Sequence, residues 1–230
     1  MTLPGVSVIV PCYNEEKNVG KLLTDILNFL PTIASDYEII VVDDGSSDAT
    51  FEIAQRFRSD NPRIKIIRHE LNKGYGVALR TGFESCSKDY IFFTDGDNQF
   101  DITEMTKLLP YIKNYDIVTG YRIKRRDNFI RKINEFSFNR LVRILFGLKI
   151  RDLNCAFKIY KKEVIKSLKL RSTLAFINSE LLIRAKKKGF TIKEVGVNHY
   201  PRQWGVQTGA NIKVILGSLN ELFQLRNELR

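Results

Sequence analysis

The chain has 230 residues, of which 43% are hydrophobic and 27% charged, proportions that are typical of a folded globular protein with a substantial core. Its net charge of +11 is strongly basic. Three widely spaced cysteines without a Cys-x-x-Cys pair argue against a disulfide framework or a zinc site, and favour a reducing, cytosolic setting. We expect no signal peptide and no membrane-spanning helix, since no window approaches the roughly 20 apolar residues that a span needs.

The first half of the chain alternates short apolar runs with amphipathic stretches. The runs predict strands at 6–10, 38–42, 65–68, 90–94 and 117–119, and the stretches predict helices beginning near Asn14, near Ser47 or Asp48, and at Val77. This alternation is typical of right-handed βαβ units. We therefore expect an α/β fold with a mostly parallel sheet covered by helices on both faces.

The second half has a different composition. The predicted elements are strands at 156–160 and 192–197, and helices at 129–146, 179–188 and 212–229. Residues 121–151 hold ten Lys and Arg against two acidic residues, a local net charge of +8. Such a segment favours a phosphate-rich ligand, an anionic membrane surface or nucleic acid, and a solvated basic face is the plainer alternative. No linker or internal repeat is visible, so we expect one domain over residues 1–230.

Polar turns follow three of the predicted strands. They are Pro11-Cys12-Tyr13-Asn14-Glu15, Asp43-Asp44-Gly45-Ser46 and Asp95-Gly96-Asp97-Asn98-Gln99. Because ligands of open parallel sheets bind beyond the carboxyl ends of the strands, we expect these turns to converge on one edge. Acidic groups crowded there repel one another unless a cation or a donor-rich ligand compensates.

The turn at residues 95–99 offers hard oxygen ligands to a divalent cation, with Gly96 allowing a sharp bend between two carboxylates. We expect Asp97 and Gln99 to bind the metal, with Asp95 ligating directly or through water. Asp44 is expected to accept hydrogen bonds from ribose or base donors. An ordinary strand-end turn is the alternative for residues 95–99. An acidic edge beside a basic segment fits a metal–diphosphate ligand, whereas the P-loop and dinucleotide glycine motifs are absent from the sequence.

In this order and spacing the motifs resemble the family 2 inverting glycosyltransferases with the GT-A fold. Within that family they resemble the dolichol-phosphate mannosyltransferase-like, polyprenyl-phosphate sugar transferases. The resemblance covers nearly the whole chain and is carried by the three turns and by residues 72–76, 120–122, 152–158 and 178–182. It implies a GT-A (Rossmann-like) sheet, with a nucleotide-sugar-binding half at 1–120 and an acceptor- and phosphate-binding half with amphipathic helices at 121–230.

The resemblance also implies roles for individual residues. The nucleotide-sugar would be contacted by Pro11, Tyr13, Asn14, Glu15, Asp44 and Asp95. The diphosphate would be held through Mg²⁺ or Mn²⁺ by Asp95, Asp97 and Gln99. The catalytic group would comprise Asp97, Arg122, Arg131, Arg202 and Asp152, with the three arginines gripping donor and acceptor phosphates. The crowded basic segment allows several alignments for Arg131.

The implied reaction is an inverting, metal-dependent transfer of a hexose from a GDP-mannose or UDP-glucose type of donor to a polyprenyl phosphate, such as dolichyl or undecaprenyl phosphate. A phosphate acceptor is already an anion and needs little or no general base. A sugar hydroxyl acceptor, the alternative, would need one, and Asp152 is the candidate. A structural cap or an arginine partner is an equal interpretation of Asp152. A nucleic-acid-binding module is a third hypothesis, which leaves the acidic turns unexplained, so we expect no nucleic acid partner.

The helix predicted at Phe129–Phe146 has the composition of an interfacial helix, with Lys and Arg on one side and Phe, Leu and Ile on the other. A core-packing helix with a solvated basic side is the alternative. We expect a protein that lies peripherally on the cytoplasmic face of a membrane. Many members of the resembled group carry transmembrane helices after the catalytic domain, so a hydrophobic partner subunit that supplies the anchor is a further expectation.

Overall fold

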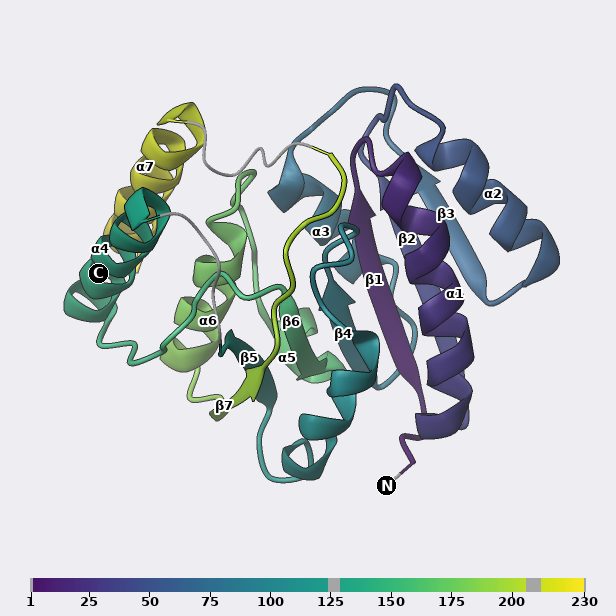
Figure 1. Cartoon of the computed structure of the whole chain (residues 1–230). Helices are drawn as coiled ribbons and strands as arrows, with labels where there is room; N and C mark the ends of the chain where they lie inside the picture. Colours follow the sequence, from purple (N-terminus) through teal and green to yellow (C-terminus); the bar gives the residue numbers. More distant parts are fainter. Residues whose placement is uncertain (1, 124–128, 206–211, 230) are drawn as a thin grey trace.

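The computed structural model describes residues 2–123, 129–205 and 212–229, with the backbone alone for 129–136 and 212–213. Its strands form one seven-stranded sheet in the order β3-β2-β1-β4-β6-β5-β7 (Figure 1). The strands are β1 (Val6–Cys12), β2 (Tyr37–Asp43), β3 (Ile64–Arg68), β4 (Tyr90–Thr94), β5 (Ile117–Arg122), β6 (Phe157–Lys161) and β7 (Ile192–Val197). The helices are α1 (Glu16–Ile33), α2 (Thr50–Asp60), α3 (Tyr75–Glu84), α4 (Phe129–Phe146), α5 (Lys162–Ser167), α6 (Ile177–Lys187) and α7 (Ile212–Glu228), with 3₁₀ turns η1 (Ile102–Lys107) and η2 (Leu109–Tyr111).

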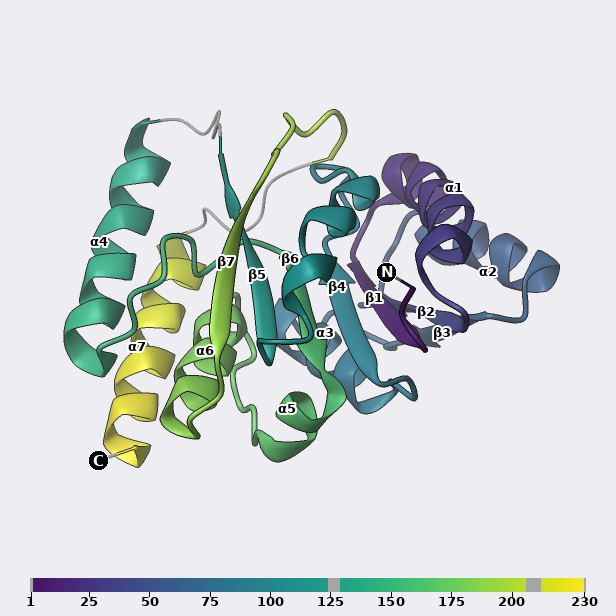
Figure 2. The same cartoon turned by 90° about the horizontal axis from the view of Figure 1, so that it is seen from below.

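Strands β1 to β4 form the parallel part of the sheet. β1 pairs in parallel with β2 and with β4, and β2 pairs in parallel with β3. Every residue of β1 is buried, because helices cover both faces, as a comparison of Figures 1 and 2 shows. Helix α3 lies especially close to β1, since a Cβ added at Gly82 would sit 2.3 Å from Ile9 Cγ2. The pairing of β1 with β2 and with β4 fixes the ends of these three strands relative to one another.

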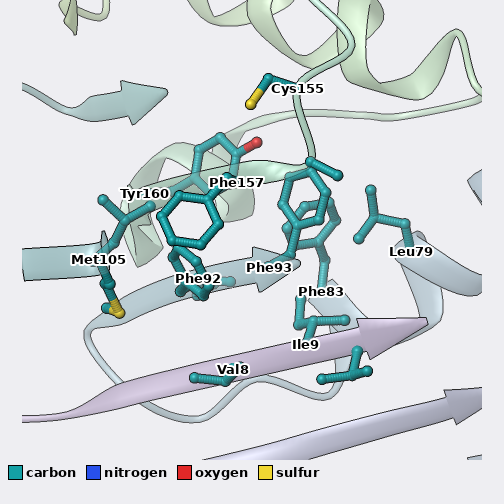
Figure 3. Packing of buried hydrophobic residues seen from close by; sticks show 14 of the residues in the cluster. Val8, Ile9, Leu79, Phe83, Phe92, Phe93, Met105, Cys155, Phe157 and Tyr160 are labelled. Carbon is teal, nitrogen blue, oxygen red and sulfur yellow. The ribbon is translucent and has the colours of Figure 1, made fainter. Parts of the chain in front are cut away.

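The remaining strands extend the sheet with a reversal of direction. β6 lies between β4 and β5 and is antiparallel to both, whereas β5 and β7 are parallel. Aromatic rings join β4 to β6: the rings of Phe92 and Phe157 meet edge to face at 4.8 Å, and those of Phe93 and Tyr160 stack at 6.3 Å (Figure 3). These contacts place the end of β4 against the second part of the chain.

Helices α4 and α7 lie side by side at the end of the molecule that also carries β5 and β7 (Figures 1 and 2). Val142 of α4 and Leu222 and Leu225 of α7 are buried, so both helices pack on the core. No helix among the described residues is long and apolar enough to cross a membrane.

The architecture confirms the α/β, GT-A (Rossmann-like), mostly parallel sheet, and every predicted strand and helix is present within a few residues of its expected ends. The N-cap of α1 is Glu15, the immediate neighbour of Asn14, whereas that of α2 is Ala49 and not Ser47 or Asp48. Neither cap residue makes a side-chain capping bond. Asp48 nevertheless accepts a hydrogen bond from Thr50 N at 3.0 Å, so it caps the first turn of α2 from one position further out.

Candidate functional site

The three polar turns converge at the carboxyl end of the parallel strands, as predicted. Cys12 of β1 lies beside Asp43 of β2, and Asp44 N donates to the carbonyl of Cys12 at 2.9 Å. Gly96, after β4, lies close to the same place, because an added Cβ would come within 2.8 Å of Cys12 Sγ and 3.0 Å of Pro11 O. Gly96 is therefore needed for close packing, and the left-handed residue of this turn is Asn98, with φ 57°.

Hydrogen bonds tie the turn after β1 to the turn after β2. Asn14, at φ 55°, donates its N–H to Ser46 Oγ at 2.9 Å, and its Oδ1 accepts from Ser47 N at 2.9 Å. Glu15 N donates to Thr50 Oγ1 at 2.7 Å. The half-buried Asn14 thus shapes the predicted nucleoside site by holding these two turns together. Of the other residues predicted to contact the nucleotide-sugar, Pro11 is buried within β1, and Tyr13 exposes 40% of its surface.

Asp44 is buried, and its two oxygens accept three hydrogen bonds from the protein. Oδ1 contacts His69 Nδ1 at 2.6 Å and accepts from Lys73 N at 2.9 Å, while Oδ2 accepts from Gly74 N at 2.8 Å. The carboxylate therefore fixes the loop that leads into α3. His69 was not among the predicted site residues, because nothing in its local sequence indicates a contact with residue 44.

Asp95 lies at the end of β4 and receives a hydrogen bond from the Tyr75 hydroxyl, 2.9 Å from Oδ1. Burial, together with the neighbouring charge of Asp97, raises the pKa of Asp95 to about 7. Burial also keeps the pKa of Tyr75 well above its ordinary value, so its hydroxyl remains a donor. Tyr75 was not among the predicted site residues, although it lies in the motif at residues 72–76.

Arg202 connects Asp97 with the turn after β1. Its Nη1 lies 3.2 Å from Asp97 Oδ2, and its Nη2 lies 2.6 Å from Glu15 Oε1. Its Nε donates to the carbonyl of Trp204 at 2.6 Å. Burial raises the pKa of Asp97, although hydrogen bonds from Gln99 N and from Arg202 oppose the shift. An arginine from the segment after β7 thus lies directly on the acidic turn after β4.

Gln99 lies next to Asp97, with its N–H 3.1 Å from Asp97 Oδ1. Its side-chain Nε2 donates to the carbonyl of Tyr200 at 2.9 Å, and Tyr200 N donates back to Gln99 O at 2.8 Å. Gln99 therefore holds the segment that delivers Arg202. The structure places Gln99 beside the predicted metal site, with its amide nitrogen directed to the backbone of that segment.

Arg122, the last residue of β5, forms a bidentate pair with Asp152. Arg122 Nε lies 2.7 Å from Asp152 Oδ2, Nη2 lies 2.7 Å from Oδ1, and the Arg122 N–H is 3.2 Å from Oδ2. Both side chains are about 5% exposed. Asp152 thus occupies the arginine-partner position that was one of its two interpretations. Arg131 lies in α4, but its side chain is outside the described residues.

The residues at the acidic edge suit a hard divalent cation. Asp95 and Asp97 supply carboxylate oxygens, and burial raises the pKa of each, so a cation that favours the ionised carboxylates would offset the cost of burying them. Within the described ranges, no cluster of three His, Cys, Asp or Glu side chains forms a complete metal site. Two carboxylates nevertheless suffice for Mg²⁺ or Mn²⁺ when substrate phosphates and water complete the coordination.

A hollow of about 730 Å³ borders the same loops, between α1 and residues 98–103 and 200–203. Its charged lining residues are Lys21, Asp25 and Asp101, so its side chains carry no excess of positive charge. A diphosphate fits this lining poorly. We therefore locate the candidate site by the carboxylates and arginines rather than by this hollow.

Comparison with known proteins agrees with this geometry. Residues 7–169 match the sequence model of the family described as Glycosyl transferase family 2. Dodecaprenyl-phosphate galacturonate synthase of Rhizobium johnstonii is 30% identical over 233 residues, covering 98% of this chain and 68% of that protein. Undecaprenyl-phosphate 4-deoxy-4-formamido-L-arabinose transferase of Pectobacterium carotovorum is 32% identical over 219 residues, covering 93% of this chain and 65% of that protein. The chain thus spans about two thirds of the length of these relatives.

Solved structures share the fold at low sequence identity. Mannosyl-3-phosphoglycerate synthase from Rubrobacter xylanophilus superposes with a TM-score of 0.77 at 16% identity, over 98% of this chain and 75% of that one. Glucosyl-3-phosphoglycerate synthase from Mycobacterium tuberculosis, solved with Mn²⁺, uridine diphosphate and glucosyl-3-phosphoglycerate, gives a TM-score of 0.71 at 18% identity, over 98% of this chain and 77% of that one. The family match covers well over half of the sequence, and the chain therefore belongs to glycosyl transferase family 2 and is a glycosyltransferase.

Proposed function

We propose that the protein transfers a hexose from a nucleotide-sugar of the GDP-mannose or UDP-glucose type to a polyprenyl phosphate, with inversion and with Mg²⁺ or Mn²⁺. The observation that carries this proposal is the contact of Arg202 with Asp97 beside the buried carboxylate of Asp95. The names of the relatives, which refer to dodecaprenyl and undecaprenyl phosphates, support the acceptor class. We also propose that residues 1–230 act as one catalytic domain, with the donor bound mainly by residues 1–120 and the phosphates and acceptor by 121–230.

In this proposal, Asp95 and Asp97 hold the divalent cation, with Gln99 at their side. The bound cation supplies positive charge to the diphosphate as it leaves the anomeric carbon. Arg122 and Arg202 bind phosphate oxygens and stabilise the same developing charge, which is where such stabilisation accelerates the reaction. Arg202 would have to exchange its ion pair with Asp97 for one with a phosphate, which would leave the Asp97 carboxylate available to hold the cation.

Asp152 bears on the choice of acceptor. Both of its oxygens accept hydrogen bonds from Arg122, so the carboxylate is already engaged by a guanidinium group. This arrangement favours an acceptor that is already an anion over a hydroxyl that has to be deprotonated. A lipid phosphate meets that requirement, and a sugar hydroxyl does not.

Helices α4 and α7 support a peripheral position at the cytoplasmic face of a membrane. Large apolar side chains are exposed on both helices, with Ile144 at 69%, Leu216 at 60% and Phe223 at 46%, and Arg140 and Arg143 are exposed on α4. Exposed apolar groups beside arginines suit an anionic bilayer surface. A hydrophobic partner subunit that adds an anchor is part of the same proposal. Co-sedimentation with anionic vesicles, compared with neutral ones, checks the direct contact.

The transfer reaction itself can be tested with the purified protein. We expect sugar to pass from GDP-mannose or UDP-glucose to dolichyl or undecaprenyl phosphate, to stop when EDTA removes the metal, and to fail with the corresponding polyprenyl alcohol. Transfer to glycolipid or oligosaccharide hydroxyls, without transfer to the lipid phosphate, would replace this proposal with the hydroxyl-acceptor alternative.

A further inference from the structure

A lysine is fully buried in the middle of the sheet, behind the candidate site. Lys158 on β6 pairs with Phe93 of β4 on one side and with Thr119 of β5 on the other, and its exposed fraction is 0%. Figure 3 shows how closely its neighbours Phe157 and Tyr160 pack against Phe92 and Phe93. Burying an ammonium group costs several kcal/mol unless hydrogen bonds compensate, so such a residue calls for partners.

The partners of Lys158 come from two segments. Its Nζ donates to the carbonyl of Leu153 at 3.1 Å and to the carbonyl of Cys155, and it lies 3.4 Å from Asn178 Oδ1. Nζ also lies 5.4 Å from the centre of the Phe93 ring. All three donors of the ammonium group therefore have acceptors. Burial lowers the pKa of Lys158 to about 8, so the group stays largely charged at pH 7.

The first segment leads to the arginine side of the site. Leu153 and Cys155 belong to the turn that begins with Asp152, and Asp152 holds Arg122 in the bidentate pair. Because Lys158 binds two carbonyls of this short turn, it fixes the direction in which the Asp152 carboxylate points. The position of the Arg122 guanidinium follows from that direction.

The second segment leads to the carboxylate side. The side-chain amide of Asn178, at the start of α6, lies near the Tyr75 hydroxyl and opposes the rise in the pKa of that hydroxyl, and Tyr75 donates to Asp95 at 2.9 Å. Lys158 is thus hydrogen-bonded to the 152–155 turn that leads to Arg122, and its Asn178 partner lies beside the Tyr75–Asp95 contact. Asp95 and Arg122 are the groups that the proposed function assigns to the metal and to the phosphates.

We propose that Lys158 is a positioning residue that sets the Asp152–Arg122 pair at the right place for the metal–diphosphate ligand. The identity of that ligand rests on the proposed function. Lys158 itself touches no substrate and acts through the 152–155 turn. A purely structural lysine would stabilise the sheet without any specific dependence on Arg122.

A double-mutant cycle separates these two roles. The variants are K158M, R122A and the double variant, with calorimetric dissociation constants for GDP and UDP in the presence of Mn²⁺ as the readout. We expect each single variant to weaken binding by about tenfold or more, and the double variant to bind no more than about threefold more weakly than R122A alone. Losses that multiply to about a hundredfold in the double variant, or an unchanged constant in K158M, would overturn the positioning role.

Y160F is the matched control. Tyr160 lies two residues along β6, is equally buried, and its hydroxyl has no hydrogen-bond partner among the described residues. Its removal should leave the dissociation constants within about twofold of the wild type. A loss in Y160F as large as that in K158M would show that any change on β6 disturbs the site, and would also overturn the proposal.

Two additional experiments apply if K158M does not fold or if the wild type binds no nucleotide. If K158M does not fold, the cycle is run with N178A and R122A, which we expect to be non-additive because Asn178 Oδ1 accepts from the Lys158 ammonium group, and additive losses would count against the proposal. If the wild type binds neither nucleotide, the proposed function fails. The positioning role is then tested alone by the same K158M and R122A cycle in urea unfolding, where additive losses would refute it.

Discussion

The parallel part of the sheet, β1 to β4, and the second part, β5 to β7, build the site in different ways. In the first part, functional carboxylates are held by backbone groups of neighbouring turns, as Asp44 is held by the N–H groups of Lys73 and Gly74. In the second part, Arg122 and Arg202 are held by ion pairs with carboxylates. Backbone hydrogen bonds therefore hold the functional carboxylates of the first part, and ion pairs hold the arginines of the second. Each part can be disturbed by its own substitutions.

The two parts meet at Arg202, which bonds Glu15 and Asp97 across 187 and 105 positions of sequence. Variants of the second part should mainly change phosphate binding and ion-pair energy. Variants of the first part should mainly change the metal site and its pH dependence. Substitutions in each part test whether the two parts differ in this way.

The largest effect is expected for R122A. Removing a guanidinium that stabilises the leaving diphosphate should lower kcat/KM for sugar transfer by about 10²- to 10³-fold. R56A, at an exposed arginine on α2, is the control and should stay within about twofold of the wild type. A full-rate R122A enzyme would remove Arg122 from the phosphate site.

D152A should lose stability as well as activity. It leaves the guanidinium of Arg122, whose side chain is only 5% exposed, without its bidentate partner. Breaking a buried pair in this way costs about 3 kcal/mol or more, measurable by urea unfolding. D25A breaks the exposed pair with Lys21 and should cost less than about 1 kcal/mol. Equal losses in the two variants would show that the Arg122 pair behaves as a surface pair.

The acidic turn of the first part predicts an unusual pH dependence without metal. The pKa of Asp95 is raised to about 7, so between pH 4 and 7 the folded protein keeps a proton that the unfolded chain has released. The free energy of unfolding should therefore fall by a few kcal/mol as the pH rises through this range, and level off above pH 7.

The quantity that isolates Asp95 is the difference between wild type and D95N in urea unfolding, measured at pH 5 and pH 8. We expect D95N to gain stability relative to the wild type at pH 8 and not at pH 5. Mn²⁺ should reduce the difference at pH 8, because it favours the ionised carboxylate. A difference that does not change with pH would mean that Asp95 titrates normally.

The smallest effect is expected for G96A, which tests the close packing of β1 and β4. The new Cβ would lie 2.8 Å from Cys12 Sγ and 3.0 Å from Pro11 O, so we expect a loss of about 1–3 kcal/mol in unfolding free energy. G20A is the matched control: its Cβ would have ordinary contacts at 3.6 Å or more inside α1, and it should be neutral or stabilising. A neutral G96A would show that the strand ends can separate without cost.

Sequence alone predicts the parallel part well, because buried strands and amphipathic helices have distinct periods. It does not predict that β6 runs antiparallel between β4 and β5, since an apolar run carries no information about its partner. It also missed the short elements α5, η1 and η2, whose three to six residues are too few to show a helical period.

The same limit applies to the site. Asp95 and Asp97 could be found as candidate ligands because both carboxylates follow one strand within three residues. Tyr75 and Lys158 could not, since their roles depend on contacts with Asp95 and with the 152–155 turn that only the folded chain creates. Asp44 was expected to face the nucleoside, and its engagement with the loop before α3 became visible only in three dimensions.

The central claim is that the acidic turn after β4 and the arginines of the second part form one metal–diphosphate site. Its most direct test is calorimetric binding of GDP and UDP to the wild type and to D97A, with Mn²⁺ and with EDTA. The account predicts that one of the nucleotides binds the wild type only with Mn²⁺, and that D97A loses this binding. If D97A binds the nucleotide with the same affinity and the same metal dependence as the wild type, the claim is contradicted.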